Sequence, residues 1–285
     1  MQPNIEQKDK WNLEKRNANL NKLTQFSLQN VNEYKGVNRI IIWPETSFEG
    51  TIPNEMELLS VISKRILTDQ KAILVVGLLS VDKNKLFNSL VFLNSKGNII
   101  HQYDKIHLVP FGEYIPLRNK FTTIANFLSL KDFSSGNIKP NFTLKGFGNI
   151  LTLICYEILF TEEVISRLSK NTNLLINITN DAWFGKTIGP YQHLALAKIK
   201  AVELGIPLAR VANTGISALI SPYGEEITKI PLYESGVRTA KLSLPLKNTI
   251  YRKYGEIIFI VSILFLIFIN KVYDYKCRKD LKNEK

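Results

Sequence analysis

The chain has 285 residues, 45% of them hydrophobic, so it is long and apolar enough for one large or two ordinary domains with a sizeable core. Its net charge of +12 favours contact with an anionic surface, either phospholipid or nucleic acid. Two cysteines, Cys155 and Cys277, and three histidines predict neither a disulfide framework nor a metal-ligand cluster, and we expect no metal and no cofactor.

The first half of the chain is predicted to alternate helices with buried strands. Apolar periodicity indicates a helix over 11–34 and another over 54–70, for which Asn54 is the expected amino-terminal cap. Short apolar runs indicate strands at 38–43, 72–79, 86–93 and 98–103. The last two flank an Asn-Ser-Lys-Gly turn, which predicts a hairpin.

The second half repeats this alternation. Residues 121–139 are irregular and form a candidate lid. A helix is expected to begin at Thr161, and another to cover 191–204. Strands are expected at 149–154, 174–178, 208–212, 216–221, 226–230 and 239–244. The pattern predicts one α/β domain with a mixed sheet over residues 1–246.

The carboxyl end is different in character. Residues 257–269 are apolar except for Ser262, and Tyr254 and Tyr273 flank them as interfacial anchors would. The twenty residues 254–273 span roughly 30 Å as a helix, which matches a bilayer core. We interpret this segment as a transmembrane helix, with a buried helix as the alternative. The basic tail 274–285 then predicts a cytoplasmic carboxyl terminus. The first residues contain no apolar run and predict neither a signal peptide nor an amino-terminal membrane helix.

A cysteine stands at the end of the most apolar strand. Cys155 follows the run 149–154, which is rich in branched residues. Open α/β sheets place their reactive groups at the carboxyl ends of strands. Taken alone, the pattern favours an inert core thiol, because free cysteine is among the residues most often buried.

Two other strand ends supply chemical partners for this thiol. Glu45 follows a predicted strand, and Lys105 follows the predicted hairpin. A carboxylate can take the thiol proton as general base. A lysine can lower the thiol pKa from about 8.5 and stabilise an oxyanion. We therefore predict acyl transfer through a thioester on Cys155. A cysteine–histidine pair, with His107 or His193 as the base, is the competing interpretation.

Several longer motifs resemble the nitrilase (carbon–nitrogen hydrolase) superfamily and, within it, the apolipoprotein N-acyltransferase branch. In chain order they are Ile41-Ile42-Trp43-Pro44-Glu45-Thr46, Lys105-Ile106-His107-Leu108-Val109-Pro110-Phe111-Gly112-Glu113-Tyr114-Ile115-Pro116, Ile154-Cys155-Tyr156-Glu157, Asn180-Asp181-Ala182-Trp183-Phe184-Gly185-Lys186 and Ile188-Gly189-Pro190-Tyr191-Gln192-His193. The carboxyl-terminal apolar segment with its basic tail belongs to the same resemblance, which runs from about Gln2 to the tail.

The resemblance implies a fold, a reaction and a location. The fold is a nitrilase-like four-layer α-β-β-α sandwich on the periplasmic side of the bacterial inner membrane. The reaction has two halves: acylation of Cys155 from a phospholipid, typically phosphatidylethanolamine, and transfer of that chain to the α-amine of a diacylglyceryl-cysteine apolipoprotein.

The resemblance also implies residue roles. Cys155 would be the nucleophile, Glu45 the base and Lys105 the oxyanion-stabilising group. The further residues implied are Glu113 as a second essential glutamate, Tyr156 and Glu157 as residues that shape the pocket, and Trp11 as a residue that helps admit the acylated substrates. The loop 180–185 would line the site or form a packing corner.

The chain also departs from the family's pattern. Family members carry several amino-terminal membrane helices, and Met1-Gln2-Pro3-Asn4 corresponds to the interior of the family's first core strand. We therefore hypothesise a carboxyl-terminal fragment that works with a separately encoded amino-terminal membrane part, or a truncated remnant with diminished or no activity.

Three other functions compete with acyl transfer to lipoproteins. One is a nitrilase-type amidase that hydrolyses a small carbon–nitrogen substrate. Another is a basic membrane-surface scaffold without turnover. Nucleic-acid binding is the weakest, because the basic residues are scattered along the chain rather than clustered.

Overall fold

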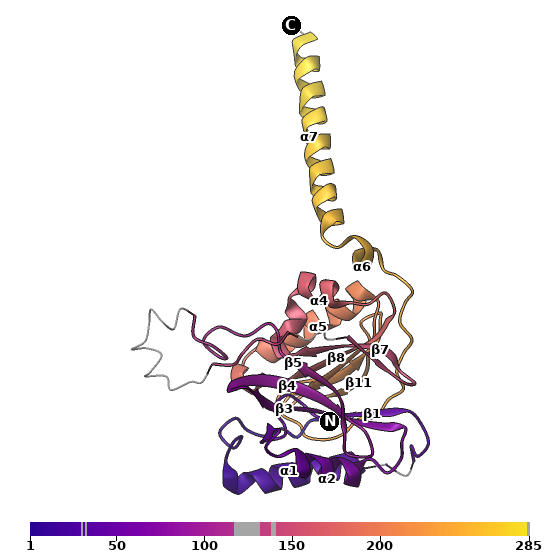
Figure 1. Cartoon of the computed structure of the whole chain (residues 1–285). Coiled ribbons are helices and arrows are strands. Elements are labelled where there is room, and N and C mark those ends of the chain that lie inside the picture. Colours follow the sequence, from indigo (N-terminus) through magenta and orange to yellow (C-terminus); the bar gives the residue numbers. More distant parts are fainter. Residues whose placement is uncertain (30, 32, 117–131, 138–140, 284–285) are drawn as a thin grey trace.

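Two β-sheets packed face to face, each covered on its outer face by helices, form the body of the molecule (Figure 1). The computed structural model describes residues 1–283 apart from 30, 32, 117–131 and 138–140. The four layers are the α-β-β-α sandwich expected from the sequence. Both sheets contain parallel and antiparallel pairs, so the mixed character is confirmed.

The first sheet has the order β1-β3-β4-β5, and β2 also pairs with β3. Its strands are β1 (Arg39–Ile42), β2 (Thr51–Ile52), β3 (Ala72–Asp82), β4 (Lys85–Leu93) and β5 (Ile99–Asp104). β1 is parallel to β3, and β4 is antiparallel to both of its neighbours. The carboxyl ends of β1 and β5 therefore lie at the same edge of this sheet.

The second sheet has the order β11-β10-β9-β8-β7-β6. Its strands are β6 (Asn141–Leu144), β7 (Gly148–Ile154), β8 (Thr172–Thr179), β9 (Leu208–Ala212), β10 (Ser217–Ile220) and β11 (Glu226–Ile230). β7, β8 and β9 are parallel, so the ends of these three strands also share one edge. Side chains such as Phe92 from the first sheet and Ile176 from the second form the core between the sheets.

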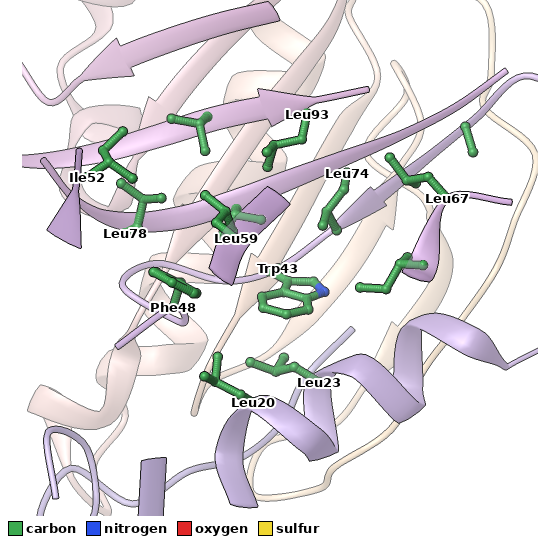
Figure 2. Close-up of a cluster of buried hydrophobic side chains, with 14 residues drawn as sticks. Leu20, Leu23, Trp43, Phe48, Ile52, Leu59, Leu67, Leu74, Leu78 and Leu93 are labelled. Atoms are coloured by element: carbon green, nitrogen blue, oxygen red, sulfur yellow. The ribbon is translucent and has the colours of Figure 1, made fainter. Parts of the chain in front are cut away.

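Helices α1 (Leu13–Leu28) and α2 (Met56–Ile66) cover the first sheet. Figure 2 shows Trp43 packed between α1 and the sheet, with Leu23 and Leu74 on either side. The Trp43 indole N–H donates to Ser27 Oγ at 2.8 Å, which satisfies the polar atom of this buried ring. Helices α4 (Thr161–Arg167) and α5 (Gly189–Leu204) cover the second sheet in the same way.

A long helix rises away from the sandwich (Figure 1). The short α6 (Ile250–Tyr254) leads into α7 (Ile257–Asn283). Its stretch Ile257–Lys276 has 20 residues and a mean hydropathy of 2.1, long and apolar enough to cross a membrane. Side chains along this stretch are exposed, as a membrane helix requires and a core helix does not permit.

The structure corrects the boundaries of both early helices. α1 begins at Leu13 rather than Trp11, because the Asn12 side chain caps it by accepting a hydrogen bond from the Glu14 backbone N–H at 2.9 Å. It ends at Leu28, before Tyr34. The predicted Asn54 cap is wrong: α2 begins at Met56, and the Asn54 amide donates instead to Thr51 Oγ1 at 3.2 Å.

The predicted strand 239–244 is absent from the structure, which describes this segment fully. Its Leu242 packs against the core between the sheets, whereas Leu244 is exposed. The segment forms one wall of a groove of about 850 Å³, and β1 and parts of β9, β10 and β11 form the other walls. Of the candidate lid 121–139, all but residues 132–137 lies outside the described residues.

Candidate active site

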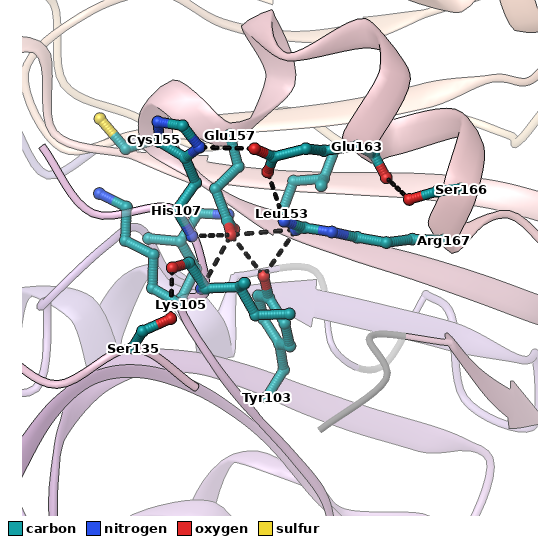
Figure 3. Close-up of polar contacts among 12 residues, drawn as sticks. Tyr103, Lys105, His107, Ser135, Leu153, Cys155, Glu157, Glu163, Ser166 and Arg167 are labelled. Carbon is teal, nitrogen blue, oxygen red and sulfur yellow. Dashed lines mark hydrogen bonds and ion pairs between the residues drawn. The ribbon is translucent and has the colours of Figure 1, made fainter. Parts of the chain in front are cut away.

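Three strand ends bring Glu45, Lys105 and Cys155 together where the two sheets meet. Glu45 lies just beyond β1, Lys105 directly follows β5, and Cys155 directly follows β7. Glu45 and Lys105 are buried, whereas Cys155 keeps the partial exposure that a nucleophile needs. Lys105 acts electrostatically on the ionisation of both Glu45 and Cys155, and Glu45 acts on that of Cys155. The side chains of Lys105 and Cys155 point to the same side in Figure 3.

Cys155 occupies a strained turn. It is the first residue of the 3₁₀ turn η1 (Cys155–Leu159), and its φ of +53° lies in the left-handed region. This conformation costs a non-glycine residue on the order of 1–3 kcal/mol and persists only where the surroundings enforce it. Thr179 Oγ1 lies 3.3 Å from Cys155 Sγ, and the Asn177 amide donates to the Cys155 carbonyl at 3.2 Å.

The resting thiol of Cys155 is protonated. Desolvation raises the pKa of Cys155 to about 12, and the negative charge of Glu45 acts in the same direction. Lys105 lowers this pKa, but its effect is the smaller one. The expectation that a lysine would bring the thiol pKa below its usual value is therefore wrong on balance, because burial outweighs the ammonium. A protonated thiol is a poor nucleophile without a base to take its proton.

A chain of polar contacts links the two glutamates to Lys105. The Asn88 amide donates to Glu45 Oε1 at 2.8 Å and to Glu113 Oε1 at 3.0 Å. Lys105 Nζ lies 2.8 Å from both carboxylate oxygens of Glu113. The backbone N–H of Val109 also donates to Glu113, at 2.8 Å. Glu113 is thus fixed by Asn88 and the Val109 N–H and in turn holds the ammonium of Lys105.

The electrostatics suit a general base beside a cation. Desolvation raises the pKa of Glu45, and the effect of Lys105 in lowering it is smaller. Burial alone would lower the pKa of Lys105, but Cys155 in its ionised form and the charges of Glu45 and Glu113 together outweigh burial and raise this pKa. Lys105 therefore remains an ammonium, and Glu45 is a stronger base than an exposed carboxylate.

Glu157 ties the Lys105 segment to the Cys155 turn (Figure 3). Its Oε1 accepts hydrogen bonds from the backbone N–H groups of Ile106 at 3.0 Å and His107 at 3.1 Å. Its Oε2 accepts one from the Ile154 N–H at 2.8 Å. Tyr103 and Arg167 also bond to Oε1, at 2.6 and 3.1 Å. One buried carboxylate therefore sets the spacing between two of the three strand ends.

Tyr156 is half-buried and Trp11 is exposed. The Tyr156 ring is 6.2 Å from that of Phe184 and 5.6 Å from that of His193, centroid to centroid. Trp11 is 45% exposed and directly follows Lys10, which enters the site. Their contact with substrate stays a prediction. Trp183 in the loop 180–185 is exposed, whereas Asp181 in the same loop is buried beneath the site.

Neither histidine forms the alternative cysteine–histidine pair in this structure. His107 Nδ1 lies 2.7 Å from Glu163 Oε1, and its ring stacks on Phe160 at 3.5 Å. His193 Nδ1 lies 2.9 Å from Asp181 Oδ1. Each histidine thus has a carboxylate partner outside the group of Glu45, Lys105 and Cys155.

Lys10 and Asn88 are site residues that were not predicted from the sequence. Lys10 is buried, and its ammonium donates to the Glu45 carbonyl at 3.1 Å and to the Thr46 hydroxyl. Desolvation lowers the pKa of Lys10 to about 8. Nothing in the polar stretch around Lys10 distinguishes it from a solvated lysine. Asn88 did leave a signal, because it interrupts an apolar strand.

Two mixed sheets packed face to face and covered on both sides by helices constitute the nitrilase type of fold. An amidase of the nitrilase superfamily from Nesterenkonia AN1, solved as a cysteine-to-alanine variant, shares it with a TM-score of 0.56 and 19% identity. The alignment covers 87% of this chain and 91% of that one. The sequence defines the relationship further. Residues 2–250 match the family described as Carbon-nitrogen hydrolase, and the chain belongs to this family.

The chain is also similar to curated apolipoprotein N-acyltransferases. The enzyme of Rhizobium etli (strain CIAT 652) is 41% identical over 206 residues, which cover 69% of this chain and 38% of that protein. The enzyme of Rickettsia prowazekii (strain Madrid E) is 34% identical over 279 residues, which cover 95% of this chain and 54% of that protein. The chain thus spans about half the length, or less, of these two relatives.

Proposed function

We propose that this chain carries the acyl-transfer chemistry of an apolipoprotein N-acyltransferase. The donor is a phospholipid of the phosphatidylethanolamine type, and the acceptor is the α-amine of a diacylglyceryl-cysteine lipoprotein. One observation carries the proposal. A buried base and a buried ammonium flank a partly accessible cysteine, in a chain whose curated relatives bear that enzyme's name.

In the first half-reaction, the Cys155 sulfur attacks the ester carbonyl of the phospholipid while Glu45 takes the thiol proton. The negative charge that develops on the carbonyl oxygen is stabilised by the Lys105 ammonium, which Glu113 holds in place. Collapse of the tetrahedral intermediate breaks the ester C–O bond. Glu45 returns its proton to the departing alkoxide, so a lysophospholipid leaves and a thioester remains on Cys155.

The second half-reaction uses the same groups in the same roles. The lipoprotein amine attacks the thioester carbonyl and gives a proton to Glu45, while Lys105 again stabilises the oxyanion. The C–S bond then breaks, an amide forms, and the Cys155 sulfur takes the proton back from Glu45. A raised Glu45 pKa suits both steps, because the same carboxyl must accept and return a proton.

Lipid access is supported by apolar side chains on the segments that carry the site. Trp11, Phe111 and Trp183 are exposed, and each lies within two residues of Lys10, Glu113 or Asp181. The apolar α7 supports a membrane location. In the proposed arrangement, α7 crosses the bacterial inner membrane and the sandwich lies on its periplasmic side.

Intact-mass spectrometry tests this function directly. The detergent-solubilised chain is incubated with phosphatidylethanolamine, beside Cys155→Ala as the matched control. We expect a mass gain of one fatty acyl group in the parent chain, none in the control, and loss of the adduct when a diacylated lipopeptide is added.

Two outcomes would contradict the proposal. Absence of the adduct in folded protein, together with ammonia release from small amides, would point to a nitrilase-type amidase. Absence of both activities in folded protein would point to a membrane-surface scaffold. Circular dichroism on the same samples establishes that the protein is folded.

A further inference from the structure

A closed ring of hydrogen bonds connects the sulfur of Cys155 with its own backbone carbonyl. Thr179 Oγ1 lies 3.3 Å from Cys155 Sγ and 3.0 Å from Asp181 Oδ1. Asp181 Oδ2 accepts from Arg210 Nη2 at 2.8 Å. Arg210 Nη1 donates to Asn177 Oδ1 at 2.7 Å, and the Asn177 amide donates to the Cys155 carbonyl at 3.2 Å. The ring thus begins and ends on the nucleophile.

The ring is buried and its charges are paired. The four residues other than Cys155 are each at most 1% exposed. Burial alone would raise the pKa of Asp181, but the charge of Arg210 and hydrogen bonds from His193 and Thr179 hold it below its usual value. Burial and the charge of Arg210 lower the pKa of His193, which favours the neutral imidazole. The ring therefore contains one carboxylate and one guanidinium.

Two features of Cys155 require such support. Its left-handed backbone conformation is unfavourable and needs enforcement from outside the turn. Its thiol must also be hydrogen-bonded both before and after it loses its proton. The Asn177 amide meets the first requirement, because it holds the Cys155 carbonyl and also lies 3.4 Å from that of Leu153. The Thr179 hydroxyl meets the second.

We propose that Thr179, Asp181 and Arg210 form a positioning network that orients the Cys155 thiol and hydrogen-bonds its sulfur in both the protonated and the ionised form. The inference rests on the proposed function only in taking Cys155 as the nucleophile. A hydroxyl offers one proton and two lone pairs. In the resting state the Cys155 S–H donates to Thr179, whose own proton goes to Asp181. Once Glu45 has taken the thiol proton, the Thr179 hydroxyl rotates and donates to the thiolate.

This rotation transfers no proton between residues. Asp181 loses one hydrogen bond during the step and keeps those from Arg210 and His193. The network therefore returns to its starting arrangement when Cys155 is reprotonated at the end of the second half-reaction, as repeated turnover requires.

Two members of the network act on the thiol in opposite directions. The hydrogen bond from Thr179 lowers the pKa of Cys155, whereas the charge of Asp181 raises it. The other charged groups that act on the thiol are Glu45, Lys105 and Lys10, and substitutions at 179 or 181 leave them in place. Substitutions at 179 and 181 should therefore shift the pKa of Cys155 in opposite directions, which a purely structural role of these residues would not produce.

The test measures alkylation of Cys155 by iodoacetamide as a function of pH, using the full chain in detergent with Cys277→Ser in every sample. Intact-mass spectrometry gives the rate. Alkylation needs no lipid, and only the thiolate reacts. We expect Thr179→Val to slow alkylation about three- to tenfold at a fixed pH between 8 and 10, since one pKa unit is a factor of ten. Thr179→Ser should restore the parent rate, and Asp181→Asn should speed alkylation.

Either of two results would overturn the inference. In the first, Cys155 of Thr179→Val is alkylated at the parent rate. In the second, Thr179→Val and Asp181→Asn change the alkylation rate in the same direction. If Asp181→Asn does not fold, because Arg210 is left unpaired, Asp181→Asn with Arg210→Met replaces it, and the expected direction is the same. If the chain does not transfer an acyl group, but Thr179→Val and Asp181→Asn still change the alkylation rate in opposite directions, the proposed function is refuted and the network is established. If the chain transfers an acyl group but the two variants do not change the alkylation rate in opposite directions, only the network is refuted.

Discussion

Lys105 Nζ lies 2.8 Å from both carboxylate oxygens of Glu113, in a pair whose side chains are 1% and 11% exposed. The pair is asymmetric in function. Glu113 also accepts from Asn88 and from a backbone N–H, so it is the fixed member, and Lys105 is held against it. An ammonium held in this way cannot turn toward solvent, and its free protons remain directed at the site.

Removal of the Lys105 ammonium should therefore cost more than one hydrogen bond to the oxyanion. Lys105→Met is expected to slow thioester formation on Cys155 at least 10²–10³-fold, the range for loss of one oxyanion donor. Glu113→Gln keeps the lysine but loosens it, and we expect a smaller loss of roughly tenfold. The exposed Lys85→Met at the start of β4 is the control and should keep the parent rate. Substantial activity in Lys105→Met, measured by intact-mass kinetics, would contradict the assigned role.

The pH dependence of thioester formation should report the ionisation of Glu45. Glu45 works as a base only when ionised, so the rate should fall as pH is lowered through its pKa. Because burial raises that pKa, the fall should begin at a higher pH than for an ordinary carboxyl near 4.5. The measurement is the initial rate of acyl-enzyme formation from pH 4 to 8.

The variant Asn88→Ala tests whether the fall in rate at low pH comes from Glu45. The Asn88 hydrogen bond lowers the pKa of Glu45, so its loss should move the fall in rate to still higher pH. Gln102→Ala on the neighbouring β5 is the matched control, because its amide bonds to Ser80 and Asp104 rather than to Glu45. If the pH at which the rate falls is unchanged in Asn88→Ala, or shifts equally in Gln102→Ala, then the fall in rate at low pH does not report the ionisation of Glu45.

Local patterns predicted the buried strands and the three strand ends, whereas the four layers were implied by the family resemblance. Buried strands are short apolar runs, and their carboxyl ends can be read directly, as at Cys155. The residues that contact the site residues were harder to predict from the sequence. Lys10 reaches Glu45 from 35 positions away, and Arg210 reaches Asp181 from 29. Such contacts depend on how the two sheets pack, and a single sequence contains no direct record of that packing.

The pKa of the Cys155 thiol also depends on packing that the sequence does not show. A lysine near a cysteine predicts a lowered pKa, but the sign of the net effect depends on how deeply the thiol is desolvated. The missing strand at 239–244 is a related case. Its alternating apolar residues fit a strand, but the segment only lines a groove with β1 and β11, the edge strands of the two sheets, and pairs with neither.

Trp43 should be the residue of the first sheet whose truncation costs most stability. Its ring is fully buried between α1 and the sheet, and its indole N–H has a partner in Ser27. Trp43→Ala should lower the free energy of unfolding by about 3–5 kcal/mol. Trp183→Ala removes the same side chain from an exposed site and should cost less than about 0.5 kcal/mol. Urea unfolding followed by circular dichroism compares the two variants, and equal losses would contradict this packing.

The apolar surface of α7 predicts how the chain partitions into lipid. Leu264 lies near the middle of the stretch Ile257–Lys276 and is exposed in the structure. An arginine at the centre of a membrane helix costs about 2.5–3.5 kcal/mol on insertion scales, which is on the order of a hundredfold in the equilibrium. Leu264→Arg should therefore float less with liposomes of phosphatidylethanolamine and phosphatidylglycerol. The control is Tyr223→Arg, which places the same charge at an exposed turn of the sandwich. If Leu264→Arg floats as well as Tyr223→Arg, α7 does not insert at this depth, and the lipid donor must reach Cys155 by another route.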